Sequence, residues 1–129
     1  MLFRSRFLVS PGATPSLLAH LGSLPVPSLP GTATVSEVLA AREAGFTEVK
    51  FFPAEASGGT AYLGALASVL PDVRFCPTGG ITPASAPSYL ALPNVACVGG
   101  SWLTPKDAVA AGEWGRITEL AAATASLWG

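Results

Sequence analysis

A lysine within an apolar stretch that favours β structure is the first candidate for chemistry in this chain. Lys50 follows Glu48 and Val49 and precedes two phenylalanines, Phe51 and Phe52. Burial disfavours the charged form of an amine and lowers its pKa, and a neutral amine attacks carbonyl carbon. We therefore expect Lys50 to form a Schiff base. These residues alone leave an alternative, in which Lys50 lies at a strand end and extends its amine to water.

Two glycine pairs beside hydroxyl residues form a second candidate site. Thr78 precedes Gly79–Gly80, and Ser101 follows Gly99–Gly100, each pair after a short apolar run. Glycine lets backbone N–H groups approach an anion closely, and a following helix N-terminus adds positive potential. Barrel enzymes commonly bind phosphate with the loops after their last two strands. The pairs therefore predict a phosphate site, and the alternative is that each only makes a tight turn.

These residues lie at the ends of apolar runs that alternate with helix signals. Threonine followed by proline marks two helix starts, at Thr14 and Thr82, and either Thr34 or Ser36 is expected to cap a further helix that runs through Ala44. We expect Gly22 to end the first helix, and helix breaks near Gly112 and Gly115. The pattern predicts strands over 6–10, 24–29, 47–52, 73–77 and 95–98, and helices over 15–21, 36–44, 60–70, 83–90 and 107–127.

Alternating strands and helices predict an α/β fold with a parallel sheet. In the strand over 47–52, Lys50 and Phe52 share one face while Val49 and Phe51 share the other, so we expect both faces to be covered. We expect one domain over residues 1–129, either an open doubly wound sheet or part of a (β/α)₈ barrel. A whole barrel needs at least about 200 residues.

Composition narrows the function classes. Half of the residues are hydrophobic and only 12% are charged, against roughly 25% in an average domain. We therefore expect elements buried on several faces, or an oligomer. The net charge of −1 offers no bulk attraction to nucleic acid or to an anionic membrane.

Cysteine and histidine content points away from a metal site. Cys76 and Cys97 each lie in an apolar run, which predicts buried free thiols in a reducing compartment. The single histidine, His20, is expected to be exposed or to cap a helix. Residues 1–9 are too short for a signal-peptide core, and no run approaches transmembrane length. We expect a cytoplasmic protein.

Longer motifs resemble one enzyme family. Segments in matching order resemble the bacterial 2-keto-3-deoxy-6-phosphogluconate (KDPG) aldolases, also known as 4-hydroxy-2-oxoglutarate aldolases. The similarity runs from about Phe7 to about Ala122. The segments are Ser10-Pro11-Gly12, Pro30 to Glu37, Lys50-Phe51-Phe52-Pro53-Ala54-Glu55, Arg74-Phe75-Cys76-Pro77-Thr78-Gly79-Gly80-Ile81 and Gly99-Gly100-Ser101-Trp102-Leu103.

The resemblance implies a lyase: a class I aldolase on a (β/α)₈ barrel, usually a homotrimer, that requires no cofactor and no metal. It would cleave KDPG, an Entner-Doudoroff intermediate, to pyruvate and glyceraldehyde 3-phosphate, or 4-hydroxy-2-oxoglutarate to pyruvate and glyoxylate. Lys50 would form the Schiff base, Phe52 would pack on the substrate and Pro11 would line the pocket. Carboxylate- and phosphate-binding positions map onto Thr78, Gly79, Gly80, Gly100 and Ser101.

One departure from the family limits this expectation. The family has three more βα units before the strand that matches Phe7-Leu8-Val9, and they carry a glutamate that acts as general acid/base. The chain resembles about the last five βα units, so we expect impaired turnover. Glu48 and Glu55 are local candidates for the base, although a salt bridge or a polar layer suits both better. Open sheet edges predict self-association.

Two other functions remain open at this point. The chain is also compatible with a non-catalytic phosphate-binding barrel fragment that needs a partner chain. A third possibility is another phosphosugar enzyme of the barrel type, such as an isomerase.

Overall fold

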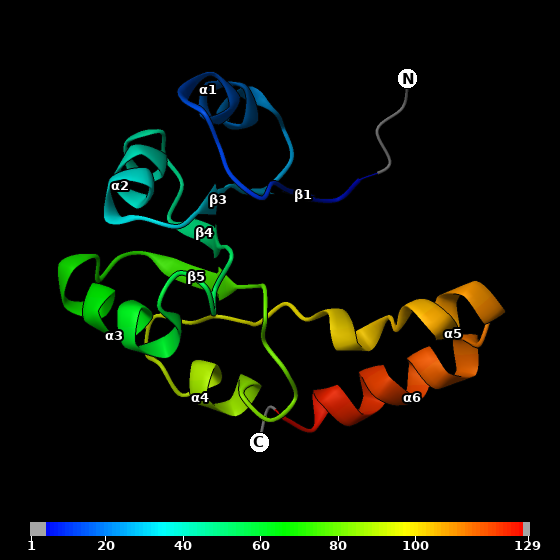
Figure 1. The fold of residues 1–129 in the computed structure, drawn as a ribbon. Helices are drawn as coiled ribbons and strands as arrows, with labels where there is room; N and C mark the ends of the chain where they lie inside the picture. Colours follow the sequence, from blue (N-terminus) through cyan, green and yellow to red (C-terminus); the bar gives the residue numbers. More distant parts are fainter. Residues whose placement is uncertain (1–4, 128–129) are drawn as a thin grey trace.

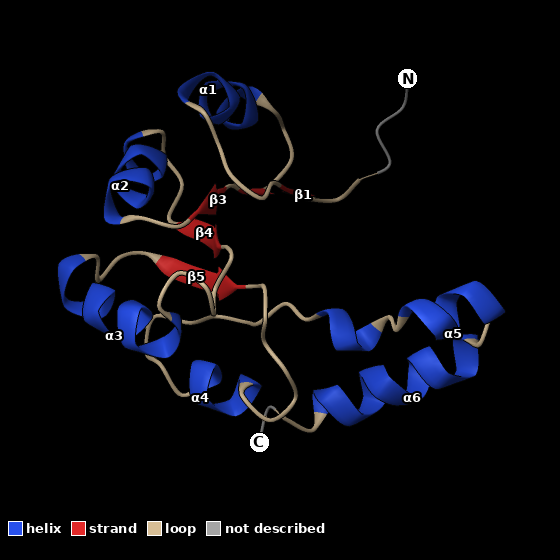
Figure 2. Cartoon of the chain, in the orientation of Figure 1, coloured by secondary structure: helices blue, strands red, loops and turns tan. Residues whose placement is uncertain are grey.

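Short parallel strands lie along the inner side of an arc of helices in the computed structural model, which describes residues 5–127 (Figure 1). Helices α1 to α4 form the arc, and α5 and α6 form a separate helical pair (Figure 2). The elements are β1 Leu8–Val9, α1 Pro15–Ser23, β2 Ser28–Leu29, β3 Gly31–Thr32, α2 Val35–Glu43, β4 Glu48–Phe51, α3 Gly59–Val69, β5 Arg74–Pro77, α4 Ala86–Leu90, the 3₁₀ turn η1 Ser101–Leu103, α5 Lys106–Ala111 and α6 Trp114–Ala125.

All strand pairing among the described residues is parallel, as predicted. β1 pairs with β2, and β4 lies between β3 and β5 in a second sheet. The strand predicted over 24–29 is shorter, because only Ser28–Leu29 pairs and the chain then continues past Pro30 into β3. Proline cannot donate to a ladder, and Pro25 and Pro27 both precede the paired residues, although the carbonyl of Pro27 still accepts from the N–H of Leu8 at 2.9 Å.

The strand predicted over 95–98 is wrong as a regular strand. Only two isolated bridges join this segment to β5, Phe75 with Val95 and Thr78 with Gly99. Between these two bridges, Cys76 and Pro77 of β5 therefore lie opposite three residues, 96–98. Such an extra residue is a β-bulge, which interrupts the ladder and turns side chains out of register.

Helix starts follow the predicted caps. The hydroxyl of Thr14 accepts from the N–H of Leu17, and Thr34 forms a reciprocal capping box with Glu37. Gly22 does not end α1, which continues to Ser23. The reason is conformational, because Gly22 is not among the glycines with positive φ.

The C-terminal helix is broken once. Gly112 adopts a φ of +68° and separates α5 from α6, as predicted, whereas Gly115 lies within α6. The helix predicted from Pro83 begins later as α4. Residues 82–85 form a turn, in which the hydroxyls of Thr82 and Ser85 each accept from the other residue's N–H.

The core lies between the sheet and the helices. Val49 and Phe51 are completely buried, and Phe51 stacks on Tyr62 of α3 at a centroid distance of 5.7 Å. On the opposite face of β4, Lys50 is only half-buried and Glu48 is exposed. The expectation that both faces are covered is therefore wrong for the described residues, because helices cover only one face.

The structure also tests the expectations about membrane spans, His20 and the two cysteines. Among the described residues, no helix has the length and apolar character needed to cross a membrane. His20 is exposed, as predicted, and Cys76 and Cys97 are free but half-buried rather than buried. Residues 1–4, part of the segment considered as a signal peptide, lie outside the described residues.

The capping box of α2 gives a test of this fold. Thr34→Ala removes the oxygen that accepts from the N–H of Glu37, so we expect about 1 kcal/mol lower unfolding free energy in urea titrations. Ser36→Ala, an exposed position in the same turn, is the matched control and should change little. Equal losses in the two variants would contradict the assigned cap.

Candidate active site

Lys50 occupies the centre of the three-stranded sheet. Its N–H donates to Pro30 at 2.9 Å, and its carbonyl accepts from the hydroxyl of Thr32 at 3.0 Å. In register, it faces Gly31 on β3 and Cys76 on β5. Lys50 therefore has a backbone fixed from both sides, and its side chain projects from the face that no helix covers.

The amine of Lys50 lies over the ring of Phe52. Nζ is 4.8 Å from the ring centroid, within the range of a cation–π contact. None of the ion pairs among the described residues involves Lys50. Phe52 thus positions the amine without neutralising it, and both predicted residues form one unit at the carboxyl end of β4.

The backbone of Pro11 packs against Gly31, which is the register partner of Lys50 on β3. A Cβ added to Gly31 would lie 2.2 Å from the carbonyl carbon of Pro11, so only glycine allows this approach. The N–H of Gly31 also donates to the hydroxyl of Ser10 at 3.3 Å. Because Gly31 is the register partner of Lys50, the loop after β1 lies one strand away from the amine.

The loop after β5 packs on the loop after β4. The N–H groups of Ala54 and Glu55 donate to the carbonyls of Thr78 and Gly79 at 2.8 and 3.1 Å. Gly79 has a φ of +103°, and a Cβ there would lie 3.2 Å from the ring of Phe52. The first glycine pair is therefore needed both for its backbone conformation and for contact with the lysine unit.

The second glycine pair lies beside Thr78. A Cβ on Gly99 would lie 2.7 Å from the hydroxyl oxygen of Thr78, and one on Gly100 would overlap the ring of Trp102. Trp102 is itself tied to α6 by a hydrogen bond of 3.0 Å to Thr124. Ser101 follows Gly100 and is exposed at the start of η1. The structure thus brings Thr78 and the second glycine pair together.

Glu55 is directed away from the lysine. Its carboxylate accepts from the hydroxyl of buried Tyr89 on α4 at 2.6 Å. Burial and this carboxylate raise the pKa of Tyr89, so the phenol keeps its proton and remains a donor. Glu55 is thus an anchor between the loop after β4 and the outer helix layer.

Glu48 lies on the same strand face as Lys50, as expected. It helps to line a cavity of about 210 Å³ together with Arg74, Cys76 and Cys97. The neighbouring Arg74 donates to the carbonyl of Pro93 and not to Glu48. Neither Glu48 nor Glu55 forms an ion pair with another described residue, so the salt-bridge alternative is wrong for both, and Glu55 instead accepts a hydrogen bond from Tyr89.

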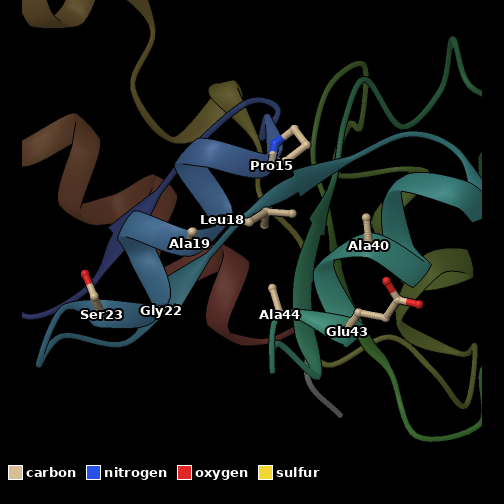
Figure 3. A pocket seen from close by; sticks show the side chains of 8 residues that line it. All are labelled: Pro15, Leu18, Ala19, Gly22, Ser23, Ala40, Glu43 and Ala44. Atoms are coloured by element: carbon tan, nitrogen blue, oxygen red, sulfur yellow. The ribbon is translucent and has the colours of Figure 1, made fainter.

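Larger hollows lie elsewhere in the molecule. A groove of about 700 Å³ runs between α1 and α2, lined by small and apolar residues with Glu43 at one side (Figure 3). It contains none of the predicted site residues. Within residues 5–127, no group of three histidine, cysteine or acidic side chains is placed to hold a metal ion.

Sequence reasoning missed two contributors to this site. The first is Gly31, whose lack of a side chain admits Pro11. The second is Tyr89, which anchors Glu55. A glycine directly after a proline in an apolar strand was the available signal for the first, since glycine inside a strand often marks close backbone approach. Nothing local to Tyr89 indicates its partner, which lies 34 residues away.

The arrangement suits reaction of an amine with a small carbonyl compound. A half-buried amine stands at the carboxyl end of a parallel strand, where α/β enzymes place their chemistry. The two glycine pairs follow β5 and the bulged segment after α4, and backbone N–H groups of such loops can bind acidic groups of such a compound.

The sequence is similar to those of known aldolases. The chain is 51% identical over 117 residues to the KHG/KDPG aldolase of Escherichia coli K12, covering 91% of this chain and 55% of that protein. The chain therefore spans about half the length of the curated relatives it matches.

Solved structures give the same picture. The KDPG aldolase of Legionella pneumophila, with pyruvate captured as a covalent carbinolamine intermediate, superposes with a TM-score of 0.90 at 48% identity, covering 93% of this chain and 58% of that one. The Zymomonas mobilis ZM4 KDPG aldolase with 3-phosphoglycerate gives a TM-score of 0.77 at 48% identity, covering 80% and 49%. The predicted α/β fold, a parallel sheet forming part of a barrel, is confirmed.

The description of the matching family is KDPG and KHG aldolase, and the match extends over residues 4–120. Together with the high identity of its relatives, this match shows that the chain belongs to the KDPG and KHG aldolase family.

Proposed function

We propose that this chain carries the Schiff-base centre of a class I aldolase acting on KDPG, on 4-hydroxy-2-oxoglutarate, or on both. The products are pyruvate with glyceraldehyde 3-phosphate or with glyoxylate. One observation carries the proposal: Lys50 projects from the centre of the sheet beside Phe52, in a chain 48% identical to an aldolase that holds pyruvate as a covalent carbinolamine.

Lys50 supplies the covalent chemistry. Its neutral amine attacks the C2 carbonyl of the keto-acid, and the resulting carbinolamine loses water to form an iminium ion. The C3–C4 bond then breaks, its electrons flow into the iminium to give an enamine, and the C4 hydroxyl loses a proton as the aldehyde leaves. Protonation of the enamine at C3 and hydrolysis release pyruvate and free Lys50.

The glycine loops supply binding. Thr78, Gly79, Gly80, Gly100 and Ser101 together hold the keto-acid carboxylate and the phosphate. Pro11 lines the pocket on the side of β3. Support comes from the contacts that join Thr78 to Gly99 and Phe52 to Gly79, because they place both loops around one strand end. The 3-phosphoglycerate in the Zymomonas relative is an anion of the same class.

Proton transfer is the weak step. Glu55 is held by Tyr89, and only Glu48 shares the strand face of Lys50. A well-placed general base typically contributes about 10²–10⁴-fold to rate. We therefore propose that iminium formation is efficient in this chain and that aldol cleavage by these residues alone is slow.

The organisation of the protein follows from the same fold. We propose a single domain over 1–129 that assembles as a homotrimer in the cytoplasm. Support comes from the low charge content and from apolar side chains left exposed, including Phe7 at 61% and Val9 at 49% beside the open edge of β1.

Borohydride trapping tests the role of Lys50. We expect incubation with pyruvate and sodium borohydride to reduce the imine and leave one N-(1-carboxyethyl) group, located on Lys50 by peptide mass mapping. Lys50→Arg should abolish the adduct. The chain has one other lysine, Lys106, exposed on α5, and Lys106→Arg is the matched control that should react normally. An adduct on Lys106, or none, would refute the proposal.

Cleavage measurements test the proton-transfer step. We expect the chain to release pyruvate from KDPG about 10²–10⁴-fold more slowly than the full-length E. coli relative, while trapping pyruvate at a comparable rate. A coupled lactate dehydrogenase assay measures the release. Equal turnover would show that a described residue, with Glu48 the first candidate, replaces the base.

Alanine substitutions test the binding loop. Gly80 has a φ of +78°, and its added Cβ would lie 2.7 Å from Cγ of Glu55. We expect Gly80→Ala to cost about 1–3 kcal/mol of unfolding free energy and to slow pyruvate trapping. Gly115→Ala, with open space around its Cβ, should stabilise α6 by about 0.5–1 kcal/mol. A loss in both would contradict a loop-specific effect.

Sedimentation velocity tests the assembly. We expect a concentration-dependent species larger than a monomer, with a trimer at high concentration. A monomer at all concentrations with a sharp, cooperative thermal transition would argue against open, pairing-prone edges.

A further inference from the structure

Cys76 lies directly beside the reactive lysine. It is the register partner of Lys50 on the adjacent parallel strand, and the side chains of such partners project from the same face of a sheet. The positive charge of Lys50 is among the groups that lower the pKa of the Cys76 thiol. The proposed aldolase chemistry uses Lys50 but leaves this thiol without a role.

Cys97 lies in the bulged segment after α4 and lines the same cavity as Cys76. The bridges at Val95 and Gly99 leave three residues of this segment facing Cys76 and Pro77 of β5. Ala96 keeps a backbone bond to Phe75 at 3.0 Å, so the extra residue falls near Cys97. A bulge re-aims side chains, and here it turns the second thiol towards the first.

The two cysteines lie at one cavity that solvent can reach. Each thiol is the largest influence on the pKa of the other. Both cysteines are free and half-buried, and both line the same cavity of about 210 Å³. A disulfide spans Cα atoms roughly 4.4–6.8 Å apart, and bridges on either side of Cys97 hold its segment against β5.

The environment also assigns unequal roles to the two thiols. The neighbouring Cys97, with further contributions from Thr78 and Lys50, lowers the pKa of Cys76 to about 7. The neighbouring Cys76 and burial raise the pKa of Cys97. The thiolate is the reactive form of cysteine, and Cys76 is the cysteine in register with the cationic Lys50, so Cys76 is the attacking sulfur and Cys97 the second thiol.

We propose that Cys76 and Cys97 form an oxidisable dithiol that takes small peroxides as substrate and closes to a disulfide beside Lys50. The Cys76 thiolate attacks one oxygen of hydrogen peroxide, an S–O bond forms as the O–O bond breaks, and hydroxide leaves to become water. The sulfur of Cys97 then attacks the sulfenic acid, the S–S bond forms, and the hydroxyl leaves with the Cys97 proton as a second water. Two thiols lose two electrons in total, and one peroxide gains them.

Disulfide closure has a consequence for the neighbouring loop. The bond would draw the bulged segment towards β5 just before Gly99, whose Cβ position is already 2.7 Å from the hydroxyl of Thr78. It would also remove the thiolate beside Lys50. We therefore expect oxidation to slow pyruvate trapping reversibly, an effect that rests on the proposed function of Lys50.

The test uses the reduced, desalted chain and hydrogen peroxide. We expect one equivalent of peroxide to remove both titratable thiols, and the intact mass to fall by two hydrogens. Peptide mapping without reductant should join the Cys76 and Cys97 peptides within a monomeric chain, and dithiothreitol should restore both thiols. Sulfinic acid on Cys76 with Cys97 unchanged, a disulfide between chains, or two unreacted thiols would each overturn the proposal.

Single variants separate the two roles. Cys97→Ser should leave a sulfenic acid on Cys76 that dimedone captures, whereas Cys76→Ser should leave Cys97 largely unreactive at neutral pH. Equal labelling of the two variants would contradict the assignment. Circular dichroism checks that each variant folds. The wild-type peroxide experiment tests the dithiol even if a variant does not fold. If the reduced chain traps no pyruvate but the disulfide still forms, the proposed role of Lys50 is refuted while the dithiol proposal is supported.

Discussion

The parallel ladder that holds β4 between β3 and β5 is the constraint on which the site depends. Lys50 is bonded through its backbone to β3, and its strand pairs along its whole length with β5. This pairing fixes where the amine stands and which residues become its neighbours. On one side Gly31 admits the loop with Pro11, and on the other Cys76 lies in register. From the local sequence alone, Lys50 could also extend its amine into water. The pairing instead fixes its backbone near the carboxyl end of the central strand.

Close backbone contact is the second organising feature. Gly31, Gly79 and Gly99 each lie where a Cβ would meet another part of the site, at 2.2 Å from Pro11, 3.2 Å from Phe52 and 2.7 Å from Thr78. Three loops from different parts of the chain are therefore packed together with little side-chain volume between them. The N–H groups of Gly31 and Gly99 are themselves used in this packing, since they donate to Ser10 and Pro77. Tight backbone packing, more than side-chain chemistry, distinguishes this site from an ordinary set of turns.

Local signals in the sequence were sufficient for much of the fold and for part of the site. Caps at Thr14 and Thr34, the parallel alternation and the strand around Lys50 depend on neighbouring residues, and all were predicted. The failures depend on distant partners or on backbone conformation. The segment after α4 reads as a strand from its composition, but a bulge opposite β5 interrupts its ladder. Gly22 looks like a helix stop, yet it keeps helical geometry. No short-range pattern could reveal that Tyr89 binds Glu55 or that Cys97 turns towards Cys76.

Glu55 links the inner and outer layers, because its N–H binds the loop after β5 while its carboxylate binds Tyr89 on α4. The order of the binding loop is thus set partly by a helix on the far side of the sheet. Any change that loosens α4 would leave the loop more conformational freedom, and under the proposed function an anion would have to remove that freedom on binding. Affinity at the strand ends would then carry an entropic cost set partly by Tyr89, a buried residue of the outer layer that does not belong to the proposed binding loops.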